Sequence, residues 1–286
     1  MAGLREIRFF QSIDRNYYQL FCREIAPENP KATVLLLHDY AGNGLDFRIV
    51  TKRLVTHGYR VLVPDLPGRG SSAALPKDAY TLVNLAKSLD ACLEDQDDEA
   101  VSVVAVGWSG TIALLAAALN PKRYQKLICL DTHPVWEPSD PTPYAAMQKI
   151  SSQVYSSQEE LLTALRPVAR VLPGMGTSHS PRLSRIGEQD AGFRYLAHPS
   201  IFEFAVEHVE QKIDFSRLCL SIKVPTFLWF SGEIPRRTLE LAAMLKAQGQ
   251  TLTPVDHAAF SDEIPLTSER QLLMLLGVLA CGPMLT

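Results

Sequence analysis

Residues 101–120 read VSVVAVGWSGTIALLAAALN, in which a run of β-branched residues passes directly into an apolar, alanine-rich run. The first part is typical of a buried strand and the second of a buried helix. Ser109 lies at the junction, and small residues at Gly107 and Thr111 allow the backbone to turn sharply there. Such a turn can lift the hydroxyl above the edge of a sheet, beside the N–H groups of the helix amino terminus. A serine that only caps the helix is the alternative.

Strand and helix patterns alternate on both sides of this stretch. Two strands are predicted near the amino terminus, in IRFFQSI and YYQLFCREI, and apolar runs predict further strands within 32–40, 59–70, 100–108, 124–132, 224–232 and 251–257. Helical spacing is found between them, at 44–57, 80–95, 110–120, 236–248 and 267–280. This alternation predicts an α/β fold with a mainly parallel sheet flanked by helices on both faces.

Residues 133–216 interrupt the alternation, because they are rich in proline, serine and histidine and show only broken helical patterns. We predict a core formed by residues 1–132 and 217–286 and a mostly helical cap formed by residues 133–216. The cap is inserted after the sixth strand, over the carboxyl ends of the strands, where such sheets bind ligands. Its aromatic side chains suggest an apolar substrate, although most of them are expected to form the core of the cap itself.

The composition indicates which kinds of partner and which cellular compartment to expect. Of the 286 residues, 47% are apolar and 21% are charged, and the formal net charge is -3 with no basic block. We therefore expect a small-molecule substrate, with neither nucleic acid nor a membrane as partner, and leave a homodimer open. The scattered cysteines form no CxxC pair, which favours the reducing cytoplasm. No metal-ligand spacing or nucleotide motif is found, so no metal and no cofactor are expected.

The stretch GWSGT resembles the nucleophile elbow G-x-S-x-G of the α/β-hydrolase family, with Thr111 in the last position. Three further stretches resemble segments of that family, in the family's order: LLLHDYAGNGLDF, VPDLPGRGSS and VDHAAFSDEIP. The resemblance covers about two-thirds of the chain, leaving out the cap. It implies the α/β-hydrolase fold and a serine hydrolase that cleaves a small ester, thioester or amide through an acyl-enzyme.

The resemblance also implies roles for particular residues. Ser109 would attack the substrate and His257 would take the proton of its hydroxyl. The backbone N–H groups of Tyr40 and Gly110 would form the oxyanion hole. Asp39 stands where the family has a glycine, and a carboxylate there is unfavourable beside an oxyanion unless it points away or is paired.

The acid that orients the histidine is harder to place. The family usually has it just after the strand found here in VPTFLWFSGE, but no aspartate follows Gly232. We expect Asp131, at the end of the preceding strand, to serve instead, because the carboxyl ends of neighbouring strands face the same crevice. Glu233 in a shifted position and a site without an acid are the alternatives. Asp131 could also be a carboxylate that only caps a loop.

Two other functions stay open. A His–Asp dyad with the acid after the earlier strand resembles the cofactor-free, ring-cleaving dioxygenases of the same fold, in which the histidine deprotonates the substrate. Asp39, Asp256 and the missing acid also allow a catalytically degenerate protein that binds a ligand without turnover.

Overall fold

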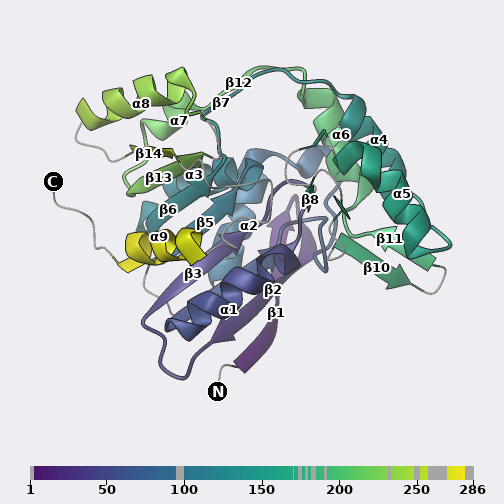
Figure 1. Cartoon of the computed structure of the whole chain (residues 1–286), viewed down its shortest axis with the longest axis horizontal. Coiled ribbons are helices and arrows are strands. Elements are labelled where there is room, and N and C mark those ends of the chain that lie inside the picture. The colour runs from purple at the N-terminus through teal and green to yellow at the C-terminus, as the bar shows by residue number, and fades with distance from the viewer. Residues whose placement is uncertain are drawn as a thin grey trace.

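The computed structural model describes residues 3–94, 100–169, 171–172, 176–177, 180–181, 185–189, 192–230, 233–247, 252–256 and 269–280. Within them, eight strands form one central sheet in the order β1-β2-β4-β3-β5-β6-β13-β14 (Figure 1). The strands are β1 (Gly3–Ile13), β2 (Asn16–Ala26), β3 (Ala32–Leu37), β4 (Tyr59–Asp65), β5 (Val101–Val106), β6 (Tyr124–Leu130), β13 (Thr226–Phe230) and β14 (Leu252–Asp256).

The sheet is mainly parallel, as predicted. β1 pairs with β2 and β2 with β4 in antiparallel fashion, whereas all other neighbours run parallel. The side chains of β3 alternate between two buried clusters, with Val34 and Leu36 on one face and Leu35 and Leu37 on the other. A strand that is buried on both faces needs a continuous apolar run, which is the pattern seen in the sequence.

Helices cover both faces of the sheet, which confirms the prediction of an α/β fold. Helices α1 (Arg48–Thr56) and α9 (Glu269–Ala280) share one apolar cluster, and helices α2 (Leu82–Glu94) and α3 (Trp108–Leu119) share the other (Figure 1). Helix α8 (Arg236–Ala247) packs beside β14. The described part of the core also contains the short 3-10 helices η1 (Gly44–Phe47), η2 (Lys77–Ala79) and η3 (Pro121–Arg123).

Residues 131–225, between β6 and β13, are called the inserted segment. Its described part carries the helices α4 (Thr142–Ser151), α5 (Gln158–Ala169), α6 (Pro199–His208) and α7 (Ser216–Cys219). It also carries the short strands β7 (Val135–Trp136), β8 (Gly176–Thr177), β9 (Ser180–Pro181), β10 (Ile186–Gln189), β11 (Gly192–Tyr195) and β12 (Ile213–Asp214). The sequence gives no sign of these strands, because two to four residues are too few to establish an alternating pattern. Strand β7 pairs with β12, so the two ends of the segment lie side by side.

Among the described residues, no helix combines the length and the apolar character that crossing a bilayer requires.

Candidate active site

The turn between β5 and α3 lies at the carboxyl edge of the sheet. Its turning residue is Gly107, with φ 57° and ψ −124°, a left-handed conformation that glycine adopts at little cost. Its N–H donates to the carbonyl of Leu130 over 2.8 Å, and its carbonyl accepts from Thr132 Oγ1 over 2.9 Å. In a nucleophile elbow, the strained turning residue is the one whose side chain is presented above the sheet. Here that residue has no side chain.

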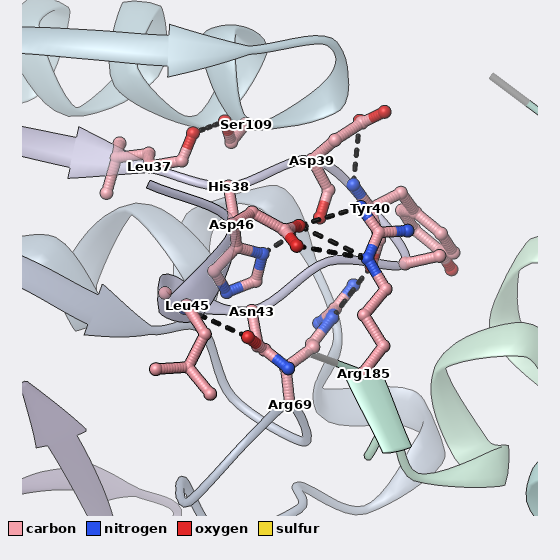
Figure 2. Close-up of polar contacts among 12 residues, drawn as sticks. Leu37, His38, Asp39, Tyr40, Asn43, Leu45, Asp46, Arg69, Ser109 and Arg185 are labelled. Atoms are coloured by element: carbon pink, nitrogen blue, oxygen red, sulfur yellow. Dashed lines mark hydrogen bonds and ion pairs between the residues drawn. The ribbon is translucent and has the colours of Figure 1, made fainter. Parts of the chain in front are cut away.

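Ser109 does not occupy the turn. Helix α3 begins at Trp108, two residues before the predicted helical run, so Ser109 lies within the first turn of the helix. Its side chain is fully buried, and its Oγ lies 2.9 Å from the carbonyl oxygens of both Leu37 and Val106. The Oγ also accepts the N–H of Val106 over 3.0 Å. Figure 2 shows the bond to Leu37. This geometry argues against Ser109 as the nucleophile, because its hydroxyl is buried between β3 and β5.

Two backbone N–H groups do converge on one point, as an oxyanion hole requires. The N–H groups of Tyr40 and Trp108 lie 2.7 Å and 3.2 Å from the same oxygen, Oδ1 of Asp39. The N–H of Tyr40, one of the two predicted oxyanion donors, is part of this arrangement. The N–H of Gly110, the other predicted donor, is not, because it donates to the carbonyl of Gly107 over 3.1 Å. The second donor is Trp108, because Trp108 directly follows the turning residue Gly107.

Asp39 occupies a place where a carboxylate is unfavourable if an oxyanion forms beside it. A β-carbon added to Gly107 would lie only 2.3 Å from its Oδ1. The carboxylate and an elbow side chain therefore compete for the same space, and the absence of a side chain at position 107 makes room for Asp39. The two N–H groups that would stabilise an oxyanion hold this anion instead.

His38 supports the loop that carries Asp39. Its ring is buried, and its Nε2 accepts the N–H of Leu66 over 2.9 Å. Because Nε2 is an acceptor, the proton resides on Nδ1, which donates to the carbonyl of Asp39 over 2.8 Å. Burial lowers the pKa of His38 to about 4, although the carboxylate of Asp65 partly opposes this effect. His38 is therefore neutral and has a structural role.

Aromatic rings from the core and from the inserted segment meet above this carboxylate. Tyr40 lies edge-on to Trp108, Tyr144 and Phe202, with ring centroids 6.1, 6.2 and 6.1 Å apart. Trp108 is in turn 5.8 Å from Trp136. The indole Nε1 of Trp108 is buried and has no hydrogen-bond partner among the described residues. The site therefore combines an apolar surface with one unpaired donor and one carboxylate.

Of the remaining predicted site residues, Asp131 and Glu233 are among the described residues and His257 is not. Asp131 follows β6 at the same edge, and its N–H donates to the carbonyl of Trp229 over 2.7 Å. The side chain of Glu233 is exposed. His257 lies outside the described residues, although β14 ends directly before it, at Asp256, which is paired in register with Phe230. No described contact brings Asp131 together with Ser109.

His133 was not expected at the site from its sequence position. Its ring lies 5.9 Å from that of Trp136 and 5.4 Å from that of Phe230. Burial lowers its pKa, and the charge of Asp131 acts in the opposite direction. Gly107, Asp39 and Trp108 were likewise not predicted as functional residues. The presence of an aspartate in place of a family glycine at position 39 was the one available signal.

Comparisons with known proteins agree with this fold. A model of the alpha/beta hydrolase fold family matches residues 32–179, and the chain belongs to that family. A haloalkane dehalogenase of Psychrobacter cryohalolentis is 30% identical over 100 residues, which span 35% of this chain and 33% of the dehalogenase. The matched region is thus about a third of the length of that relative. Family membership and this relative support a hydrolase.

Solved structures extend the similarity over nearly the whole chain. A thioesterase domain from the curacin biosynthetic pathway has a TM-score of 0.69 and 17% identity, and the match covers 98% of this chain and 100% of the domain. The esterase EaEST of Exiguobacterium antarcticum has a TM-score of 0.67 and 19% identity, with 96% and 99% of the two chains covered. At this identity the likeness shows the shared fold.

Proposed function

We propose that this protein is a hydrolase of small molecules whose reaction takes place above Gly107 and does not pass through an acyl group on Ser109. One observation carries the proposal: the turning residue of the elbow is Gly107, while the Ser109 hydroxyl is buried against Leu37 and Val106. To attack a substrate, Ser109 would have to break these contacts and cross the plane of the turn.

The position of Asp39 favours the same conclusion. Attack on an ester, thioester or amide places negative charge on the former carbonyl oxygen, and stabilisation needs N–H donors that are not already used. The N–H groups of Tyr40 and Trp108 already hold the carboxylate of Asp39. A second anion beside it would be repelled. Acyl transfer in this hole would therefore require Asp39 to leave first.

The experiment that tests the proposal combines labelling with turnover. A fluorophosphonate probe reacts with activated serines, and we expect no labelling of the folded wild type. A panel of aryl esters, acyl thioesters and alkyl halides is then followed by proton release, and we expect turnover of at least one class. Ser109→Ala should keep that turnover if it remains folded. Labelling that disappears in Ser109→Ala would contradict the proposal and restore the Ser109, His257 and Asp131 triad.

A protein that binds a small molecule without converting it is the second candidate. The observation in its favour is again Gly107, because an elbow without a side chain offers no nucleophile of its own. A compound from the panel that raises the melting temperature, and is recovered unchanged after long incubation, would support this candidate.

A further inference from the structure

Strand β1 forms one edge of the central sheet (Figure 1). Among the described residues it pairs only with β2, and the register runs from Ile13, opposite Asn16, along the whole strand without a bulge. Natural sheets usually protect their edges, because the strand there is short, bulged or interrupted by proline. Strand β1 has 11 residues and contains no proline. In the described part of the structure, this edge is therefore open to a further strand.

The turn that joins β1 to β2 determines which backbone groups face the edge. Asp14 and Arg15 form a two-residue turn, with φ 48° and 65°. Ile13 and Asn16 are therefore the hydrogen-bonded pair that closes the hairpin. Hydrogen-bonded and non-hydrogen-bonded pairs alternate along an antiparallel ladder. The odd-numbered residues of β1 thus bond to β2, and the even-numbered residues direct their N–H and C=O groups outward.

The even-numbered residues also carry exposed side chains on one face of the sheet. Leu4 and Phe10 are 67% and 57% exposed, and the exposed Glu6 and Arg8 lie between them. Neither of these two charged side chains forms an ion pair among the described residues. The order along the strand is apolar, acidic, basic, apolar. Read in the opposite direction, this order is complementary to itself, so a second copy of β1 that runs antiparallel matches it.

We propose that β1 is the interface of a homodimer, in which two copies of this chain join their sheets edge to edge about a two-fold axis at Ile7. In this register Glu6 lies opposite Arg8 of the partner subunit. Leu4 lies opposite Phe10 of the partner subunit, and symmetry repeats both pairs. These are the residues whose backbone groups face outward, so the same pairs form the hydrogen bonds between the strands.

Other registers are less favourable. An axis at Glu6 would place the two copies of this carboxylate opposite each other, and an axis at Arg8 would do the same with two guanidinium groups. Like charges directly opposite each other destabilise a sheet. An axis between two residues would set the exposed side chains of one copy opposite the buried ones of the other. The alternation of faces and charges along β1 therefore selects the axis at Ile7.

The proposed interface is independent of the proposed function. Two strands, β2 and β4, separate β1 from β3, and β5 lies beyond β3. A two-fold axis perpendicular to the sheet reverses the direction of every strand in the partner subunit. The carboxyl ends of the parallel strands of the two copies therefore lie at opposite edges of one continuous sheet, and each copy keeps a separate candidate active site. Because both copies use the same edge, the assembly closes at the dimer.

The test measures the mass of the full chain by sedimentation over a series of concentrations. We expect a dimer for the wild type and a dissociation constant at least about tenfold higher for Glu6→Arg, because each substitution acts twice across the axis. Arg8→Glu should have the same effect. An equimolar mixture of these two variants should dimerise like the wild type, because every charge at the interface then meets its opposite. The matched control, Glu159→Arg at an exposed position of α5, should remain dimeric.

The outcomes test the interface and its register separately. A monomeric wild type, or a dimer that both single variants retain, would overturn β1 as an interface between copies and leave this edge to a strand of a different protein. Single variants that are monomeric and do not combine in the mixture would overturn the register with its axis at Ile7. The mixture also controls for folding, since two misfolded chains would not restore the dimer. No readout involves turnover, so failure of the proposed function would leave this test unaffected.

Discussion

At the scale of single residues, the Ser109 hydroxyl joins the amino terminus of α3 to β3 and β5. Three contacts of 2.9–3.0 Å surround an oxygen that is fully buried. Ser109→Ala leaves the Val106 N–H without this acceptor, and an unsatisfied buried group costs about 1–3 kcal/mol. We expect a loss of that size in the free energy of unfolding by urea. Ser221→Ala, which removes a 2.7 Å bond to the carbonyl of Leu218 at an exposed position, should cost less than about 0.5 kcal/mol. Equal losses would contradict the structural role of Ser109.

His38 makes stability depend on pH. Its pKa is lowered to about 4 in the folded state by burial, from the ordinary value of 6.5. Between these two values the unfolded chain binds a proton that the folded chain does not, so stability falls as the pH decreases from 6.5 to 4 and then levels off for this group. Urea unfolding at steps of half a pH unit should show this loss. In His38→Gln the corresponding part of the slope should be absent. An unchanged slope would mean that other groups cause the acid sensitivity.

At the scale of secondary-structure elements, the α/β core can be predicted from the sequence, whereas the exact residue at which the chain turns after β5 cannot. Apolar runs such as the one that contains Val34–Leu37 specify buried parallel strands, because both faces of the sheet are covered. The first residue of α3, by contrast, cannot be predicted from the apolar pattern. Gly107 and Ser109 are both small residues at a boundary, and periodicity does not resolve a shift of two residues. The positive φ of Gly107 identifies it as the turning residue. The sign of φ cannot be predicted from the pattern of apolar residues in the sequence.

The prediction of the oxyanion donors is limited for the same reason, because it depends on the exact position of the turn. The position of Tyr40 could be predicted because it follows from the end of β3 alone. The choice between Gly110 and Trp108 depends on which residue turns, so the assignment of Gly110 follows from the assignment of Ser109 as the turning residue. The role of Asp39 depends on two segments that are far apart in the sequence and meet only in the fold. The aspartate at position 39 is unusual in the sequence, but its contact with Trp108 cannot be predicted from the sequence.

A single methyl group added at Gly107 is expected to destabilise the protein. In Gly107→Ala the left-handed backbone costs about 1–2 kcal/mol, and the new β-carbon also collides with Oδ1 of Asp39 at 2.3 Å. Gly58→Ala is the matched control, because Gly58 has φ 85° but an added β-carbon there meets nothing closer than 3.7 Å. We expect Gly107→Ala to be the more destabilising change in thermal unfolding. Adding Asp39→Gly to Gly107→Ala should recover the difference. Equal effects of the two alanine variants would show that Asp39 does not compete for this space.

At the scale of the whole molecule, the inserted segment is tied to the loop that presents Asp39. Arg185 Nη2 and Asp46 Oδ2 form an ion pair of 2.7 Å that is almost fully buried (Figure 2). Tyr195 donates to the carbonyl of Ala41 over 2.6 Å, and the hydroxyl of Tyr40 donates to the carbonyl of Ile201. These contacts join residues 40–46 to a segment more than a hundred positions away in the chain. The geometry of the site therefore depends on how the inserted segment packs.

The buried ion pair gives the largest predicted loss of stability. Arg185→Met removes the guanidinium and leaves the Asp46 carboxylate buried without it, which costs about 3–5 kcal/mol. Arg236→Met, at an exposed i,i+4 pair with Glu240, should cost at most about 1 kcal/mol. The double variant Asp46→Leu with Arg185→Met should be more stable than Arg185→Met alone, because neither charge of this pair is then left buried. Hydrogen exchange should show the loss in α4 and α6 as well as in the loop after β3. If Arg185→Met destabilised only the inserted segment and left the loop protected, the two parts would be energetically independent and the packing of the segment would not set the position of Asp39.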